Sequence, residues 1–469
     1  MILIVAIDLI AVGILIYLAK SRGLERALPF VAFVFTVIPR EAVITLPGLF
    51  DLTCQRLLLV VLIVLYAVLP RKRTTGGGFA TPLKWLIGIH ICWCIVSTAN
   101  SVVPILSVKK MIGEVVEYYF LYFVFVRTIS DVRTVRRILF AIAAAVIVCS
   151  VFGAVEAYTD WRLLDWFPSV RYRFSSWNLN DANERGTRIQ TSFAHPILFG
   201  AGLVMGITLA LYLVTTTKQG GKRAFLWVGL LLMFLNIYKT SSRGPWLAVI
   251  LSFVFFLLLG HNRLRRYLAV LAVLSVLVMV ARPGVWDTLA NIYIGTVDPT
   301  SPLGSSYEYR YALKRVVAKA VSQSPERAMW GYGMESFYEL HLEGDLNGKP
   351  YPFISCDSSW LELLVETGYV GLLIISTLLI TPAWKAWKDF KRLPRPDRYL
   401  SLTLLVTMVS YYFMMLSVAM YAWGQNSYML WILIAASMAY GRLRRSELAR
   451  ERIDGSRELT PVPLAATLP

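Results

Sequence analysis

Long apolar stretches, separated by short polar ones, run through nearly the whole chain. Runs of roughly 17–25 apolar residues are long enough to cross about 30 Å of hydrocarbon as α-helices. The run near 28–45 is the weakest, because it contains two prolines, an arginine and a glutamate. The pattern predicts an all-α, polytopic integral membrane protein with about 12–13 transmembrane helices. The predicted spans lie near residues 2–19, 28–45, 56–70, 83–99, 111–126, 138–157, 197–214, 224–238, 245–260, 267–281, 358–381, 399–420 and 427–441.

Composition supports a membrane protein. Of the 469 residues, 57% are hydrophobic and 16% are charged, whereas a soluble protein carries about 25% charged residues. The net charge of +18 does not indicate nucleic-acid binding, because no soluble domain is predicted to carry such a site. A cytoplasmic excess of Lys and Arg and contact with anionic lipid account for it. The five cysteines lack metal-ligand spacing and predict no disulfide framework.

The connections between the spans alternate in charge. One alternating set is rich in Lys and Arg and consists of 20–26, 71–73, 127–137, 218–223, 261–266, 385–398 and the C-terminal tail. By the positive-inside rule this set is cytoplasmic, which puts the N-terminus outside and the C-terminus inside. The turn that holds Lys239 and Arg243 then lies on the outer face. Topology gives these cations no reason to be there, so they are candidates for a functional site.

The spans and connections divide the chain into six regions. They are N-terminal transmembrane helices (1–157), a first outer loop (158–196), transmembrane helices with the Lys239–Arg243 turn (197–282), a large outer loop (283–357), C-terminal transmembrane helices (358–441) and a cytoplasmic tail expected to be disordered (442–469). Both outer loops are expected to contain short helices. The first run lacks a basic n-region and a small-residue cleavage site, so we expect a retained helix rather than a signal peptide.

The first outer loop is rich in arginine. Before His195 and Pro196, where the next span begins, come Arg171, Arg173, Arg185 and Arg188. Each is interpreted either as a solvated residue that balances nearby carboxylates or as a ligand for an anion. In the span that follows, Gly202 and Gly206 lie four residues apart, which predicts close packing against a neighbouring helix.

The large outer loop contains a predicted amphipathic helix. Ser305 and Glu308 form a capping-box pattern that opens a helix through about Gln323. Its apolar stripe consists of Leu313, Val316, Val317, Ala320 and Val321, and its basic positions are Arg310, Lys314, Arg315 and Lys319. This helix either lies on anionic lipid or turns its basic side towards an anionic substrate. Gly331 and Gly333 then predict a tight bend.

The large loop ends at Asp357. Ser359 and Glu362 form a second capping pattern, and Asp357 would favour the N-terminus of the span that follows. Capping does not explain Glu366, about two turns into that span. A carboxylate at such a depth usually faces a polar cavity and pairs with a cation.

Charged and imidazole side chains therefore gather at the predicted outer ends of the spans. They are Arg188, His195, Lys239, Arg243, Arg310, His341, Asp357 and Glu366. Arginine suits phosphate or diphosphate, because its fork binds two oxygens at once and keeps its charge. No metal-site or Walker-type motif is present, so no metal, ATP or other cofactor is predicted. An enzyme on this face then needs a substrate that is already activated.

Four segments resemble the signatures of the O-antigen ligase and polymerase superfamily, over roughly residues 180–375. KTSSRGPWLAVILSF (239–253) has a Ser-Arg-Gly turn that begins a span. RIQTSFAHPILFGAGL (188–203) is similar to the family's Arg-x-x-(Gly/Ser)-Phe-x-His-Pro entry into a helix. The segments 309–337 and 357–373 resemble its long loop and the exit from that loop.

The resemblance implies a glycosyltransferase of the bacterial inner membrane that takes its glycan from polyprenyl diphosphate, without a metal. Arg188, Arg243 and Arg310 would bind the diphosphate and stabilise it as a leaving group, with Lys239 as a further ligand. A base at the start of the span after the long loop would deprotonate the acceptor hydroxyl, and the attack would invert C1.

The chain departs from the family pattern at Asp357, where the family usually has histidine. A carboxylate can also act as a base, so we predict Asp357 and Arg243 as catalytic residues. His341, His195 and Glu366 are the alternative bases or supporting groups. The departure favours polymerisation of exopolysaccharide or O-antigen repeat units over ligation of glycan to lipid A core.

Two other functions compete with this hypothesis. A glycan polymerase acting on lipid II also uses an outer-loop aspartate but lacks the Ser-Arg-Gly turn. A transporter or flippase for the same lipid-linked anionic glycan would place charges through the membrane centre, where the candidates are Asp8, Glu114, Glu117 and Glu156. The expected partners are polyprenyl-diphosphate-linked oligosaccharide, the lipid bilayer and other glycan-export or chain-length proteins, and no nucleic acid.

Overall fold

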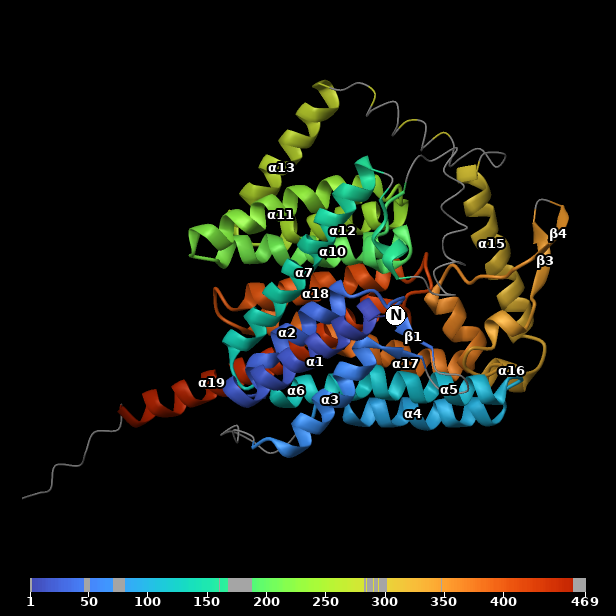
Figure 1. Ribbon diagram of the computed structural model, residues 1–469, viewed down its shortest axis with the longest axis horizontal. Helices are drawn as coiled ribbons and strands as arrows, with labels where there is room; N and C mark the ends of the chain where they lie inside the picture. The colour runs from blue at the N-terminus through green and yellow to red at the C-terminus, as the bar shows by residue number, and fades with distance from the viewer. Residues whose placement is uncertain are drawn as a thin grey trace, which may run out of the picture.

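Helices account for most of the regular structure of the protein (Figure 1). The computed structural model describes residues 2–45, 51–70, 81–159, 161–167, 188–281, 302–346 and 348–458, with the single positions 284, 290 and 294. The N-terminal helices are α1 (Ile2–Arg22), α2 (Leu24–Val37), α3 (Cys54–Val68), α4 (Lys84–Ala99), α5 (Pro104–Glu114), the π-helical η1 (Val115–Phe120), α6 (Leu121–Thr128), α7 (Val132–Tyr158) and η2 (Leu163–Trp166).

The remaining elements begin in the last part of the first outer loop. The helices are η4 (Thr191–Phe193), α10 (Pro196–Thr216), α11 (Gly220–Lys239), α12 (Arg243–Leu259), α13 (Asn262–Ala281), α15 (Pro302–Val321), α16 (Pro325–Trp330), η5 (Phe337–Glu339), α17 (Ser359–Arg392), α18 (Arg398–Met414) and α19 (Gly424–Glu458). In the described ranges the strands form two antiparallel pairs, β1 (Val43–Ile44) with β2 (Leu52–Thr53) and β3 (Glu343–Leu346) with β4 (Lys349–Pro352).

The prediction of an all-α polytopic membrane protein is confirmed. Each of the predicted apolar spans overlaps a helix. Five helices of the described ranges are long and apolar enough to cross a membrane, namely α1, α7, α10, α11 and α17. Three shorter apolar helices are α3, α4 and α12. The total of 12–13 spans stays a prediction.

Two predicted spans extend too far. The span at 28–45 contains α2, which ends at Val37, and the chain then pairs β1 with β2. The span at 399–420 contains α18, which ends at Met414. Apolar residues continue past the end of α18, and past α2 they resume at Ala42 after Pro39, Arg40 and Glu41, so hydropathy alone did not reveal either boundary.

Helix α10 lies in the core of the bundle, with its side chains almost entirely buried. Close packing at its glycines is confirmed. A Cβ atom on Gly202 would lie 2.7 Å from Phe193, and one on Gly206 would lie 2.6 Å from Val146. Side chains at these positions would push neighbouring elements away from α10.

The two predicted sets of connections lie at opposite ends of the bundle. In Figure 1, α15, α16, β3 and β4 lie at the right-hand end, and α19 leaves the bundle at the left. We call the first the loop end and the second the tail end. Connections at the loop end bond to one another, through Val102 and Tyr332, Arg40 and Ala422, and Arg310 and Ser417. At the tail end the contacts include Ser130 with Glu25 and Arg442 with Ile129.

Several buried carboxylates have clear structural partners. Glu117 pairs with Arg56 at 2.6 Å and accepts a hydrogen bond from Tyr428. Glu156, near the end of α7, accepts from backbone amides in the last part of the first outer loop, those of Gln190 at 3.1 Å and Thr191 at 2.9 Å. Glu156 therefore fixes the segment that leads from Arg188 into α10.

The apolar stripe of α15 packs against protein. Leu313, Val317, Ala320 and Val321 are buried in a small core that also contains Phe337 and residues of α17. The stripe is thus covered without lipid, and the exposed side of the helix carries Lys314, Arg315 and Lys319.

A break in α17 receives the turn after α16. Gly368 has φ +69°, and a Cβ atom there would lie 2.2 Å from the carbonyl oxygen of Met329. The predicted tight bend at Gly331 and Gly333 is confirmed, with φ +73° and +101°. Backbone amides after this bend donate to α17, Tyr332 to the carbonyl of Val365 at 2.9 Å.

Three local predictions were wrong. Helix α15 begins at Pro302, so Ser305 lies inside the helix and does not cap it. Helix α17 is capped by Ser358, whose hydroxyl accepts from the amide of Leu361, and not by Ser359. The region 442–469 was expected to be disordered, yet α19 continues to Glu458, and residues 459–469 lie outside the described ranges. Arg171, Arg173 and Arg185 also lie outside them.

Candidate active site

The Ser-Arg-Gly turn connects α11 to α12 at the loop end. Ser241 has a left-handed backbone with φ 48°, and Ser242 is the extended N-cap of α12. The hydroxyl of Ser242 donates to the carbonyl oxygen of Thr240 at 3.0 Å. These contacts close the turn and fix Arg243 as the first residue of α12.

Arg243 occupies a position that helix stability does not favour. A helix N-terminus carries a partial positive charge, and a cation there is repelled by it. For a bound anion the two positive charges act together. The side chain is half-buried. The place of Arg243 is therefore better suited to anion binding than to folding.

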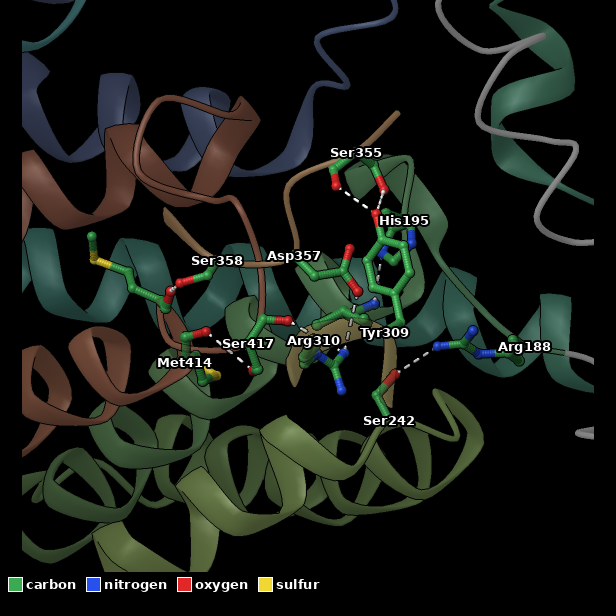
Figure 2. Close-up of polar contacts among 12 residues, drawn as sticks. Arg188, His195, Ser242, Tyr309, Arg310, Ser355, Asp357, Ser358, Met414 and Ser417 are labelled. Atoms are coloured by element: carbon green, nitrogen blue, oxygen red, sulfur yellow. Dashed lines mark hydrogen bonds and ion pairs between the residues drawn. The ribbon is translucent and has the colours of Figure 1, made fainter. Parts of the chain in front are cut away.

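Arg188 holds this turn from the neighbouring segment. Its Nε donates to the carbonyl oxygen of Thr240 at 3.0 Å, and its Nη2 donates to the hydroxyl of Ser242 at 2.9 Å (Figure 2). Sequence reasoning assigned Arg188 to the diphosphate alone. The structure adds a positioning role, because two of its donors are bonded to the turn that carries Arg243.

Arg310 and Asp357 form an ion pair beside the turn. The Nη2 atom of Arg310 lies 3.5 Å from Oδ2 of Asp357 and 3.5 Å from the carbonyl oxygen of Ser417 (Figure 2). About a third of each charged side chain is exposed, 31% for Arg310 and 35% for Asp357. Burial raises the pKa of the Asp357 carboxyl above its ordinary value, and the charge of Arg310 opposes that rise.

Ser417 links the ion pair to the Ser-Arg-Gly turn. Its carbonyl accepts from Arg310, and its hydroxyl oxygen would lie 2.9 Å from a Cβ atom on Gly244. The glycine after Arg243 therefore lets the connection between α18 and α19 approach closely. This brings Arg243, on α12, near the Arg310–Asp357 pair, although the three residues lie on different elements.

Ser359 anchors the same connection to the start of α17. Its hydroxyl donates to the carbonyl of Val418 at 2.9 Å and accepts from the amides of Met420 at 2.8 Å and Tyr421 at 3.1 Å. Ser359 is the second residue after Asp357. One short segment thus carries the candidate base and fixes the connection that contacts Arg310.

Tyr309 positions the chain just before Asp357. Its hydroxyl donates to the carbonyl of Ser355 at 2.6 Å, and its ring lies 5.2 Å from that of Phe353. Burial raises the pKa of Tyr309 to about 12, so the phenol stays protonated and keeps this hydrogen bond at neutral pH.

His195 caps α10. Its Nδ1 accepts from the amide of Ile197 at 3.2 Å. Burial and the charge of Arg188 lower the pKa of His195 to about 4. The imidazole is therefore neutral near pH 7, and with Nδ1 as acceptor its proton lies on Nε2, where it can donate.

Comparison with known families identifies the region around this site. A family model described as O-antigen ligase matches residues 228–376. Residues 228–376, called the O-antigen ligase domain below, are therefore similar to that family. The comparison with curated proteins gives no match. The resemblance found in the sequence is confirmed over the stretch shared with this domain, and the chain is a membrane protein with a domain of a glycosyltransferase type.

The O-antigen ligase domain contains most, but not all, of the site. It runs from α11 through the broken part of α17 and so includes Arg243, Arg310 and Asp357. Arg188 and Ser417 lie on either side of it in the sequence. The segments that flank the domain therefore supply contacts that hold its turn and its ion pair.

Three predicted site residues of the domain lie in other surroundings. The ammonium of Lys239 is 5.3 Å from the centre of the Tyr158 ring. His341 is exposed, and its side chain forms no hydrogen bond or ion pair with another described residue. The carboxylate of Glu366 is buried and accepts from the amide of Glu335 at 2.7 Å.

Glu366 belongs to a second charged cluster. Lys110 on α5 pairs with Glu335 at 2.7 Å and lies among the carboxylates of Glu114, Glu335, Glu362 and Glu366. Glu366 was expected to pair with a cation in a polar cavity. The cation near it is Lys110, which forms its ion pair with Glu335, the residue whose amide donates to Glu366. Its bond to the turn after Gly333 makes Glu366 a structural residue of the domain.

No described group of three or more His, Cys, Asp or Glu side chains has the arrangement of a metal site. The sequence did not point to Ser417, and it pointed to Ser359 only as a helix cap. The predicted span at 399–420 hid the connection, although the polar run Gly424, Gln425 and Asn426 follows shortly after it. That run was the available sign that the helix ends early.

Proposed function

We propose that the chain is a metal-independent glycosyltransferase that moves a glycan from polyprenyl diphosphate to an acceptor sugar hydroxyl. One observation carries the proposal. A carboxylate, Asp357, and a guanidinium, Arg310, lie 3.5 Å apart, and Ser417 joins them to the turn that begins with Ser242 and Arg243. A base and two anion-binding cations are thus available to one substrate.

The proposed reaction is a single displacement. Asp357 takes the proton of the acceptor hydroxyl as its oxygen bonds to C1 of the donor sugar. The bond between C1 and the diphosphate oxygen breaks, and its electron pair leaves with the polyprenyl diphosphate. Attack from the opposite side inverts the configuration at C1.

Leaving-group stabilisation is assigned to the cations. Charge develops on the diphosphate oxygen as the C1–O bond breaks, and fixed positive groups stabilise that charge. Arg243 acts together with the N-terminus of α12, and Arg310 acts from α15. Arg188 contributes by holding the turn through Thr240 and Ser242.

Asp357 is suited to the role of base. It is partly exposed, so an acceptor hydroxyl can reach it. Its raised pKa makes it a stronger base than an ordinary surface aspartate. The charge of Arg310 favours its ionised form. His195 is a weaker candidate, because its Nδ1 already accepts a hydrogen bond from the amide of Ile197.

We further propose that the acceptor is another lipid-linked repeat unit, so that the enzyme polymerises exopolysaccharide or O-antigen. Asp357 in place of the histidine usual in the family supports this. The second candidate is ligation of glycan to lipid A core, which the description of the matching family favours. The reaction is placed on the outer face of a bacterial inner membrane, with the N-terminus outside.

A transporter of the same lipid-linked glycan is less well supported. Glu117 and Glu156 are engaged by Arg56 and by backbone amides, and so serve the packing of helices. Glu114 lies beside Lys110 in the cluster around α5. These contacts give three of the four intramembrane carboxylates partners within the protein.

The test is a reconstituted transfer assay. Purified protein with a polyprenyl-diphosphate-linked oligosaccharide should yield longer chains and free polyprenyl diphosphate, both measured by mass spectrometry. Asp357→Asn and Arg243→Ala should each lower the rate by on the order of 100-fold or more. Arg315→Ala, which removes an exposed arginine from the same loop end, is the matched control and should keep the rate.

The acceptor arm of the assay separates the two candidates. With lipid A core present, a polymerase should still extend lipid-linked chains, whereas a ligase should transfer them to the core. Undiminished product from the Asp357 and Arg243 variants would show that the site is wrongly assigned. If neither reaction releases free polyprenyl diphosphate, the proposal of glycosyl transfer is rejected.

A further inference from the structure

A cleft at the tail end of the bundle is lined by a cluster of cations. Its volume is about 730 Å³. The cationic side chains are Arg22, Arg26, Arg136, Arg137, Lys218 and Lys222. None of the thirteen residues that line it is acidic. The cleft lies between the first turns of α2, α7 and α11 and the end of α10, far along these helices from the Ser-Arg-Gly turn.

Internal contacts leave much of this charge uncompensated. Arg22, Arg137 and Lys218 are exposed and form no hydrogen bond or ion pair with other described residues. Lys222 lies 5.7 Å from the centre of the Phe140 ring. Cations at one membrane face are expected from topology, but that bias spreads charge over many loops. Six cations around one cleft repel one another unless an anion lies between them.

The backbone adds to the positive potential. Helices α2 and α11 both begin at the cleft, at Leu24 and Gly220. Each N-terminus carries a partial positive charge that favours an anion. Neither has a side-chain cap, since Gly23 and Gln219 make no capping hydrogen bond.

Of the other seven lining residues, three are polar and four are apolar. The polar ones are Thr216, Thr217 and Gln219, and the apolar ones are Pro29, Phe140, Ala141 and Leu213, which belong to α2, α7 and α10. These helices continue into the bundle, so the apolar wall faces the same direction as a lipid chain in the adjoining leaflet. A soluble anion would leave this wall uncovered.

We propose that this cleft binds an anionic phospholipid with two phosphate groups. The phosphates lie among the six cations, and an acyl chain lies along Pro29 and Phe140, the two apolar lining residues that are only partly buried. Guanidinium groups bind phosphate oxygens in pairs, and basic pockets between transmembrane helices suit such headgroups. The proposal concerns the opposite end of the bundle from Asp357 and does not depend on glycosyl transfer.

The test measures lipid binding to the full chain. Protein in neutral phosphatidylcholine nanodiscs is titrated with cardiolipin, and bound lipid is counted by native mass spectrometry. Arg22→Gln/Arg137→Gln/Lys218→Gln should weaken binding on the order of 100-fold, about five-fold for each cation. The control, Lys388→Gln/Lys391→Gln/Arg392→Gln, removes three cations from the end of α17, outside the cleft, and should change affinity little.

A second variant keeps the proposal testable if the triple variant fails to fold. Gln219→Glu adds a carboxylate to the cleft at the start of α11, where an acidic residue stabilises the helix. It should weaken cardiolipin binding about five-fold while leaving the melting temperature unchanged or higher.

Three results would overturn the proposal. The first is equal loss of binding in the triple variant and its control, or none in Gln219→Glu. The second is displacement of cardiolipin by equimolar pyrophosphate, which would assign the cleft to a soluble anion. The third is equal affinity for phosphatidylglycerol, which has one phosphate.

Discussion

The carboxylate of Asp357 is subject to two opposing effects. Burial raises its pKa, and Arg310 at 3.5 Å lowers it. A base must be ionised, so activity is present above this pKa and is lost as the pH falls through it. Arg310 therefore sets how far into acid the proposed enzyme works, in addition to binding the leaving group.

This balance predicts a shift of the pH profile. In Arg310→Gln the opposing charge is gone, so the pKa of Asp357 rises further and the acid limb of kcat/KM moves to higher pH. The measurement is the normalised pH–rate profile of each protein, which is independent of the overall loss of rate. Arg315→Gln, also on α15, should leave the limb in place. An unmoved limb in Arg310→Gln would exclude Asp357 as the titrating base.

At the scale of elements, hydropathy located nearly every helix, because apolar runs of sufficient length have few other structures open to them. The ends were harder to predict. Ser358 rather than Ser359 caps α17, because the hydroxyl of Ser359 instead bonds to the connection between α18 and α19. A capping pattern depends only on residues close together in the sequence, whereas this hydroxyl forms hydrogen bonds with residues about sixty positions away.

The same limit applies to the site. Arg243, Arg310 and Asp357 were found from residue type and family resemblance. The contact of Arg310 with Ser417 depends on how three separate elements meet, and nothing in the spacing of the residues encodes it. Arg188 was predicted as a ligand of the diphosphate, which stays a prediction, and its contacts with Thr240 and Ser242 were not foreseen.

Ser359 predicts a coupling between the α18–α19 connection and activity. Ser359→Ala leaves the amides of Met420 and Tyr421 without their partner and removes one of the two hydrogen bonds that the carbonyl of Val418 accepts from Ser359. The expected cost is about 1–3 kcal/mol of unfolding free energy, with a loss of transferase rate as Ser417 shifts. Thermal unfolding and the transfer assay measure both. Thr377→Ala, which removes an exposed hydroxyl from the same helix, should change neither; a fully active Ser359→Ala would disprove the coupling.

The contact between α10 and α12 makes a separate prediction. A Cβ atom on Gly200 would lie 2.5 Å from the ring of Pro245. Gly200→Ala should therefore destabilise the protein by about 1–3 kcal/mol, because the rigid ring has to move. Thermal unfolding should show the loss, and it should shrink in a Pro245→Ala background. Gly88→Ala, where no atom lies within 4 Å, should be neutral or stabilising; an equal loss there would refute the steric argument.

At the scale of the whole molecule, the bundle has two chemically different ends. The loop end gathers the Ser-Arg-Gly turn, the Arg310–Asp357 pair and the Lys110 cluster. The tail end gathers the lipid-binding cleft proposed here. Helices such as α11 join them, with Lys222 near one terminus and Lys239 at the other. The proposed reaction lengthens lipid-linked glycan on the outer face of the membrane. The loop end must therefore face away from the cytoplasm.

The orientation can be tested by cysteine labelling. Of the native cysteines Cys92 is exposed and the other four are buried, so Cys92→Ser gives a low background. Ser322 at the end of α15 and Gln219 before α11 are both exposed and lie at opposite ends of the bundle. In spheroplasts a membrane-impermeant maleimide should label Ser322→Cys, whereas Gln219→Cys should react only after the membrane is opened. The reverse order of labelling would invert the topology and place Asp357 on the cytoplasmic side. That result would contradict both the positive-inside argument and the proposed reaction on the outer face.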